Sequence, residues 1–99
     1  MIELSSKQKN DVCIEATAAA NALYLRSFED WVSASIKCEA KGLSEQERID
    51  SIKTSYERAI KSNIAYHEIM AKTEDEMGRK DSAALHSAMA KAYSAFILN

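Results

Sequence analysis

The chain has 99 residues, no proline, only two glycines and a formal net charge of −2. A chain of this length forms one domain at most, residues 1–99, and the scarcity of turn-forming residues predicts long elements of all-α type. The 15 acidic residues outnumber the 13 lysines and arginines, which argues against the basic surface that nucleic-acid binding requires.

The first predicted helix runs from about residue 6 to residue 41. Apolar and small residues recur along it at spacings of three and four, as on one face of an amphipathic helix. The predicted face consists of Cys13, Ala16, Ala20, Leu23, Phe28, Trp31, Ser35 and Cys38, widened by Val12, Ala19, Leu25, Val32 and Ile36. If both cysteines lie on one continuous helix, they are about 37 Å apart, too far for a disulfide. We therefore interpret both as apolar filler in a reducing compartment.

This first helix has an alternative interpretation. Ser27, followed by Phe28, Glu29 and Asp30, resembles an N-cap, and a break near Ser27 would make the domain a four-helix bundle. We favour a continuous helix because neither proline nor glycine marks this position. The preferred fold is a long antiparallel helical hairpin with a shorter third helix.

The second predicted helix covers about residues 45–77. Gly42 suits the left-handed conformation that ends the preceding helix, and Ser44 with Glu47 forms a capping box. The apolar stripe of this helix consists of Ile49, Ile52, Tyr56, Ala59, Ile60, Asn63, Ile64, His67 and Met70.

The third predicted helix covers about residues 82–97. Gly78 suits the C-terminal cap of the second helix, and Asp81 or Ser82 suits the N-cap of the third. Its stripe consists of Ala84, Leu85, Ala88, Met89, Ala92, Tyr93, Phe96 and Ile97. Small side chains let helix backbones approach closely, so we expect the alanine-rich runs at 16–20 and 83–95 to face each other.

The sequence contains no complete catalytic or metal-binding motif. His67-Glu68 begins like the zinc-protease motif HExxH, but Ala71 occupies the position of the second histidine. A di-iron bundle needs a glutamate three residues before a histidine, and neither His67 nor His86 has one. We predict no enzymatic activity, metal, cofactor or small-molecule substrate, and expect the His67 ring to bond a neighbour.

The N-terminal region lacks the apolar segment of a signal peptide. The longest uncharged stretch near this end runs from Ala16 to Leu25, about half the length that a membrane-spanning helix needs. We expect a cytoplasmic protein without membrane association.

A difference in helix length predicts where a partner binds. The first two helices span about 50 Å each and the third about 26 Å, so the end of the hairpin is left with two helices only. Uncovered apolar surface of this kind is typical of interaction sites, where Trp and Tyr are frequent anchors. The predicted partner-binding residues are Tyr24, Phe28, Trp31, Val32, Ile36, Ile49, Ile52 and Tyr56.

These observations favour a small protein–protein interaction module of the adaptor, inhibitor or chaperone type, bacterial or phage-like. Its partner would be another protein or a second copy in a homodimer. The alternative hypothesis is a nucleic-acid-linked regulator with a basic helix face. That face would comprise Lys53, Arg58, Lys61, Lys72, Arg79, Lys80 and Lys91.

Overall fold

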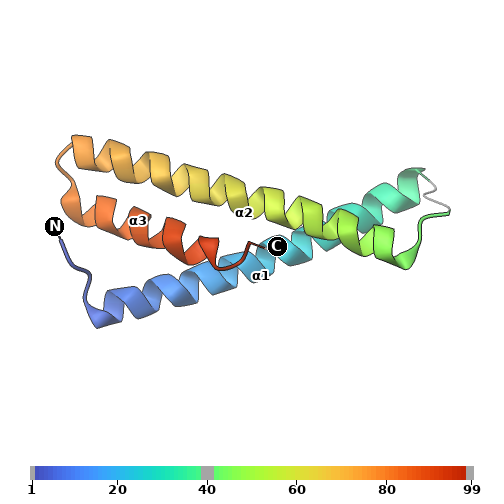
Figure 1. The fold of residues 1–99 in the computed structure, drawn as a ribbon, viewed down its shortest axis with the longest axis horizontal. Coiled ribbons are helices and arrows are strands. Elements are labelled where there is room, and N and C mark those ends of the chain that lie inside the picture. Colours follow the sequence, from blue (N-terminus) through green and yellow to red (C-terminus); the bar gives the residue numbers. More distant parts are fainter. Residues whose placement is uncertain (1, 39–41, 98–99) are drawn as a thin grey trace.

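The computed structural model describes residues 2–38 and 42–97, and its secondary structure over these ranges is helical, as predicted (Figure 1). The helices are α1 (Ser6–Cys38), α2 (Glu45–Glu76) and α3 (Lys80–Ser94). The long helices α1 and α2 form a hairpin, and the shorter α3 folds back antiparallel to α2 (Figure 1). The molecule is elongated, with dimensions of 54 × 25 × 21 Å.

Helix α1 is continuous, so the four-helix alternative is wrong. It starts at a capping box in which Ser5 Oγ accepts a hydrogen bond from the Gln8 amide at 3.1 Å, and the Ser5 amide donates to Gln8 Oε1 at 2.9 Å. The helix continues through Ser27 without a break, and the Ser27 side chain is buried. The predicted end at residue 41 lies outside the described residues.

The predicted start of α2 is confirmed. Ser44 Oγ accepts a hydrogen bond from the Glu47 amide at 3.1 Å, while the Ser44 amide donates to Glu47 Oε1 at 3.3 Å. Gly42 just before it has the expected positive φ of 89°. The first amides of the helix therefore gain partners from its own sequence.

The turn from α2 to α3 is a Schellman motif around Gly78, which has a φ of 79°. The Arg79 amide donates to the Glu74 carbonyl at 2.8 Å, and the Gly78 amide donates to the Asp75 carbonyl at 3.1 Å. This turn leads the chain directly into α3 at Lys80, two residues earlier than predicted. Asp81 lies inside the first turn, where its negative charge favours the helix N-terminus.

The N-cap prediction for α3 is therefore wrong: Arg79 takes that position, without a side-chain cap. Helix α3 also ends at Ser94, before the predicted residue 97. Phe96 and Ile97 lie beyond the helix and pack against the core.

The core lies where all three helices meet. Its buried residues are Val12, Ala16 and Ala20 of α1, Tyr56 and Ile60 of α2, and Met89 and Tyr93 of α3. Ala88 and Ala92 of α3 pack against this cluster, which confirms the predicted approach of the two alanine-rich runs. The small side chains of α1 let α3 pack closely against it.

The predicted inward face of α1 needs correction. Cys13, Leu25, Phe28 and Ile36 were all expected on it, and each is exposed. The buried line instead passes through positions 12, 16, 20 and 27. A shift of one residue turns a side chain by about 100° around a helix, which separates Cys13 from Val12. The side chain of Cys38 lies outside the described part.

Candidate protein-binding surface

The eight residues predicted to bind a partner differ in their exposure. Tyr24, Phe28 and Ile36 are exposed, and Ile36 keeps 75% of its accessible surface. Trp31, Val32 and Ile49 are half-buried. Ile52 and Tyr56 are buried within the single chain, Tyr56 as part of the core where the three helices meet, so both offer little surface to another protein.

Tyr56 is held inside the hairpin by an aromatic contact. Its ring meets that of Tyr24 edge to face, with centroids 5.2 Å apart and planes at 73°. Burial, followed by the nearby Tyr24, raises the pKa of the Tyr56 hydroxyl. Tyr24 therefore serves both the hairpin contact and the exposed surface beside it.

Trp31 is partly covered by α2. The guanidinium carbon of Arg48 lies 6.0 Å from the Trp31 ring centroid, at the outer limit of a cation–π contact. This contact covers part of the indole near the end of the hairpin, where α3 does not reach (Figure 1). Trp31 thus lies at the edge of the available surface and not at its centre.

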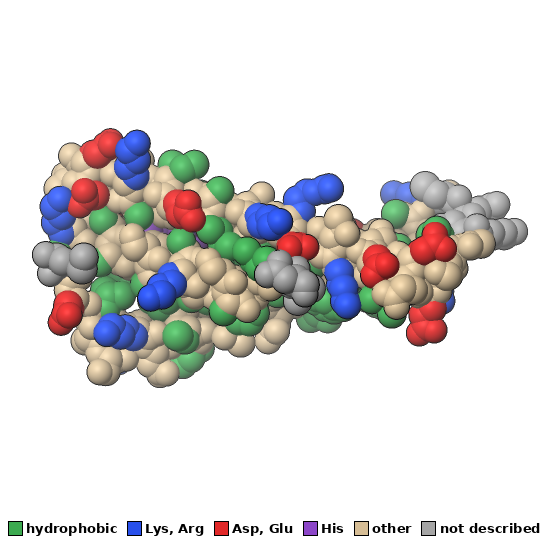
Figure 2. All heavy atoms as spheres, in the orientation of Figure 1, with side chains coloured by type: hydrophobic (Ala, Val, Ile, Leu, Met, Phe, Trp, Pro, Cys, Tyr) green, Lys and Arg blue, Asp and Glu red, His purple; other side chains and the backbone are tan. Residues whose placement is uncertain are grey.

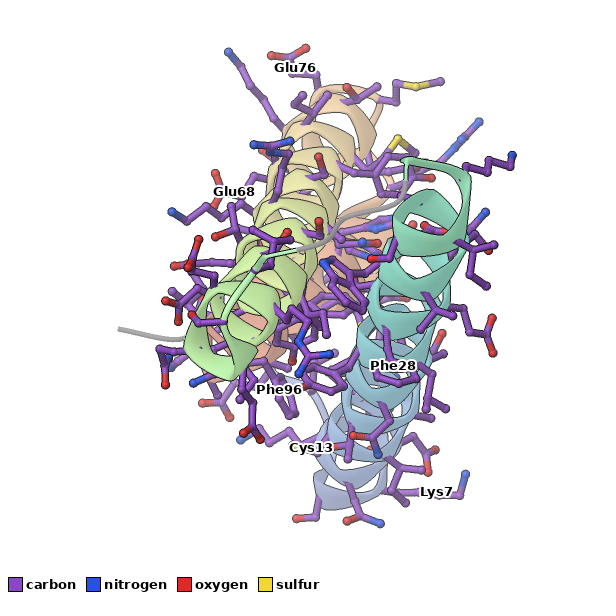
Figure 3. The ribbon with its side chains drawn as sticks, turned by 90° about the vertical axis from the view of Figure 1, so that its right-hand side faces the viewer. Lys7, Cys13, Phe28, Glu68, Glu76 and Phe96 are labelled. Atoms are coloured by element: carbon purple, nitrogen blue, oxygen red, sulfur yellow. The ribbon has the colours of Figure 1, made fainter. Side chains whose placement is uncertain are left out.

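A row of mostly apolar side chains follows the outward face of α1. We call it the outer stripe, and it consists of Ile14, Ala18, Asn21, Leu25, Phe28 and Val32. All are exposed except the half-buried Val32, and all are apolar except Asn21. Its spacings alternate strictly between four and three, which is the repeat of a coiled-coil seam. Ile14 is 60% exposed, Leu25 61% and Phe28 49%. In Figure 3, Phe28 projects from α1, whereas Phe96 lies between α1 and α2.

The outer stripe includes a shallow apolar hollow. Its lining residues are Cys13, Ile14, Thr17, Ala18 and Asn21. Four of them stand at positions i, i+3, i+4 and i+7, the arrangement that receives one side chain of a facing helix in knobs-into-holes packing. The small Ala18 leaves this hollow open, so α1 presents a recess for a large apolar side chain.

The two edges of the outer stripe differ in charge. Glu15 and Glu29 follow one edge, directly after Ile14 and Phe28, and both are exposed. The other edge carries the uncharged Thr17, Tyr24 and Trp31. A helix that packs on the stripe therefore meets acidic side chains on one side only.

The predicted basic face is interrupted by ion pairs. Lys61 lies 3.6 Å from Glu57, Arg79 3.3 Å from Glu74, and Lys80 2.6 Å from Asp75. Figure 2 shows Lys and Arg side chains interspersed with acidic ones on the visible face. This arrangement gives the nucleic-acid hypothesis less support than the apolar stripe gives the protein-binding one.

Two histidines meet between α2 and α3. His67 Nδ1 and His86 Nδ1 are 2.8 Å apart, which confirms the expected bond to a neighbour, and the His67 ring stacks on Tyr93 with centroids 5.6 Å apart. Burial lowers the pKa of His67, His86 lowers it further, and Glu15 of α1 partly opposes both effects. Among the side chains that the structure describes, no three from His, Cys, Asp or Glu are grouped to hold a metal ion.

None of the helices, within the part of the chain described, is both long enough and apolar enough to cross a membrane. Comparison with protein-family models, with curated proteins and with solved structures gives no match to this chain. The outer stripe was only partly found from the sequence: Phe28 and Val32 were assigned to the partner surface, but Ile14, Ala18 and Leu25 were not. The signal that would have found them is the unbroken alternation of four and three from Ile14 to Val32.

Proposed function

We propose that this chain is a non-enzymatic protein–protein interaction module of the adaptor, inhibitor or chaperone type. It binds another protein chain through the outer stripe of α1. The observation that carries the proposal is the row of exposed apolar side chains at coiled-coil spacing, at Ile14, Leu25 and Phe28.

Packing within the chain supports this assignment. The opposite side of α1 already contacts α2 and α3 through Val12, Ala16 and Ala20, so the outer stripe is not required for the intramolecular core. A helix that serves only its own core is expected to be polar on the outside. Apolar side chains on both sides of α1 instead suit a helix that packs inside the protein and also against a partner.

The charge and cysteine pattern indicate the setting in which the module works. The exposed thiol of Cys13 is free, and exposed free thiols fit a reducing compartment such as the cytoplasm. The acidic edge at Glu15 and Glu29 favours partners without a matching row of acidic side chains. Cytoplasmic location is therefore part of the proposal.

A photo-crosslinking experiment tests the proposed function. Phe28 is replaced by a photoreactive phenylalanine analogue in cells that naturally make the protein, and the matched control carries the analogue at Tyr66, an exposed aromatic residue of α2. We expect strong crosslinks to protein at position 28 and few at position 66. Excess wild-type chain should suppress the crosslinks at position 28, whereas excess Leu25→Glu chain should not. Equal yields at both positions would contradict the proposal.

A further inference from the structure

The outer stripe is self-complementary when it is read in the opposite direction. If two copies of α1 pack antiparallel with their centres near residue 23, Ile14 faces Val32 of the second copy and Asn21 faces the second copy's Leu25. In the same register, Ala18 faces the second copy's Phe28. Each pair occurs twice, as the twofold symmetry of an isologous dimer requires.

We infer that the occupant of the outer stripe is a second copy of this chain, with the two α1 helices antiparallel. This inference rests on the proposed function, because it names the partner of the same surface. It assigns the hollow at Ile14, Thr17, Ala18 and Asn21 to the Phe28 side chain of the second copy.

Side-chain size favours the antiparallel direction over the parallel one. In a parallel pair with matched register, Phe28 would face Phe28 of the second copy and Ala18 would face Ala18. Two large side chains and two small ones would then lie within three turns of each other, so the helices would have to be far apart at one pair and close together at the other. In the antiparallel pair the small Ala18 faces the large Phe28 of the second copy, and the other two pairs join side chains of similar size, so the layers have more even widths. Protein interiors are packed without large voids, which favours the antiparallel register.

The geometry of the subunit leaves room for such a dimer. The outer stripe lies almost opposite the buried residues Val12, Ala16 and Ala20, so α2 and α3 of each copy stay on the outside. The paired segment from Ile14 to Val32 is about 27 Å long, half of the 54 Å length of the molecule. An interface of one helix pair lies at the small end of the range for stable complexes, so the dimer should form reversibly.

Charge on the edges of the stripe provides a further constraint. The antiparallel register brings Glu15 close to Glu29 of the second copy, and this like-charge contact occurs twice. Exposed pairs of this kind weaken an interface only slightly, so they limit the affinity of the dimer without preventing it. In the parallel register, Glu29 would instead lie beside Tyr24 of the second copy.

Analytical ultracentrifugation over a wide concentration range tests the dimer. We expect a monomer–dimer equilibrium for the wild-type chain and at least a tenfold increase in Kd for Leu25→Glu, since a charge would then be buried against Asn21 of the second copy. The matched control is Ile69→Glu on α2, where the wild-type side chain is 64% exposed and Kd should stay unchanged. Circular dichroism should show the same helix content in all three proteins.

Disulfide trapping tests the direction of the helices, in a background with Cys13→Ser and Cys38→Ser. Mild oxidation of an equal mixture of Ile14→Cys and Val32→Cys chains should give a crosslinked heterodimer, and Ile14→Cys alone should give almost none. In the antiparallel register, Ile14 and its own copy are about 27 Å apart along the helix. A crosslink of Ile14→Cys with itself, but not with Val32→Cys, would overturn the antiparallel arrangement.

The inference and the proposed function fail in different ways. A wild-type chain that stays monomeric at every concentration, or a Kd that Leu25→Glu leaves unchanged, overturns the dimer. If photo-crosslinks from position 28 then reach other proteins but not a second copy, the proposed function stands with a different partner. If position 28 gives no crosslinks above the control at position 66, the proposed function fails as well.

Discussion

Two histidines, His67 and His86, are in direct contact between α2 and α3. Their Nδ1 atoms are 2.8 Å apart, so one ring must donate and the other accept, and at least one of them is neutral. Tyr66 on α2 and Tyr93 on α3 contact the His67 ring, and Glu15 acts on it from α1. The charge state of this cluster therefore affects the contact between α2 and α3.

The lowered pKa of His67 predicts how stability depends on pH. Burial is the main cause, and His86 adds to it. In the unfolded chain a histidine has a pKa of about 6.5, so below that pH the unfolded state binds more protons than the folded state. Stability is then complete above about pH 6.5 and decreases as the pH falls toward the lower folded pKa.

Urea unfolding between about pH 7 and pH 5 measures this effect. The midpoint for the wild-type chain should decrease over this interval, and His67→Gln should make the decrease smaller. A pH slope that is the same in wild type and His67→Gln would show that this ring is not the titrating group.

Among single residues, the prediction for His67 was confirmed and the prediction for Cys13 was wrong. The neighbour bond of His67 was predicted correctly, although the sequence did not identify His86 as the partner, because the two are 19 residues apart. Cys13 was expected in the core and is exposed. Its neighbour Val12 is buried instead, and a helix with apolar residues on both sides does not reveal which side packs inward.

At the scale of elements, local signals were the most reliable. The capping box at Ser44 and the left-handed glycines Gly42 and Gly78 are found where the sequence placed them, because each depends only on residues within one turn. The start of α3 was predicted two residues late, since the Schellman turn enters the helix without a side-chain cap. Only the three-dimensional path of that turn determines where α3 begins.

The capping box of α2 predicts that two serine-to-alanine changes alter the free energy of unfolding in opposite directions. Ser44→Ala removes the acceptor for the Glu47 amide and should lower the free energy of unfolding by about 1 kcal/mol. Ser51→Ala, at an exposed position inside the same helix, should raise it by a few tenths of a kcal/mol because alanine has the higher helix propensity. Chemical denaturation measures both, and equal effects would contradict the role of the cap.

At the scale of the whole molecule, the third helix is shorter than the hairpin, as predicted. Helix α3 does stop short of the hairpin end (Figure 1), but Ile52 is still buried within the single chain, and Tyr56 belongs to the core that all three helices share. Exposed apolar side chains also run along the outside of α1, at Ile14, Leu25 and Phe28. Helix lengths predict how far a third helix reaches, but they do not predict which side of α1 it covers.

The acidic edge predicts how salt and charge affect the proposed dimer. Screening should weaken the contact between Glu15 and the second copy's Glu29, so the wild-type dimer should become tighter as salt increases. Glu29→Lys turns two repulsive contacts into attractive ones, and Kd should fall by roughly fivefold at low salt. Glu68→Lys, an exposed change on α2, serves as the control in the same ultracentrifugation series. A weaker dimer for Glu29→Lys would contradict the antiparallel register.

The position of Cys13 has a practical consequence. Its free sulfur lines the recess beside Ile14 and Ala18, so the protein carries a built-in chemical reporter for that recess. Alkylation of this sulfur, followed by mass spectrometry of the modified peptide, should slow down as protein concentration rises and a neighbouring aromatic ring shields it. Binding at this surface can thus be followed on the unlabelled natural chain, without a dye or an engineered probe.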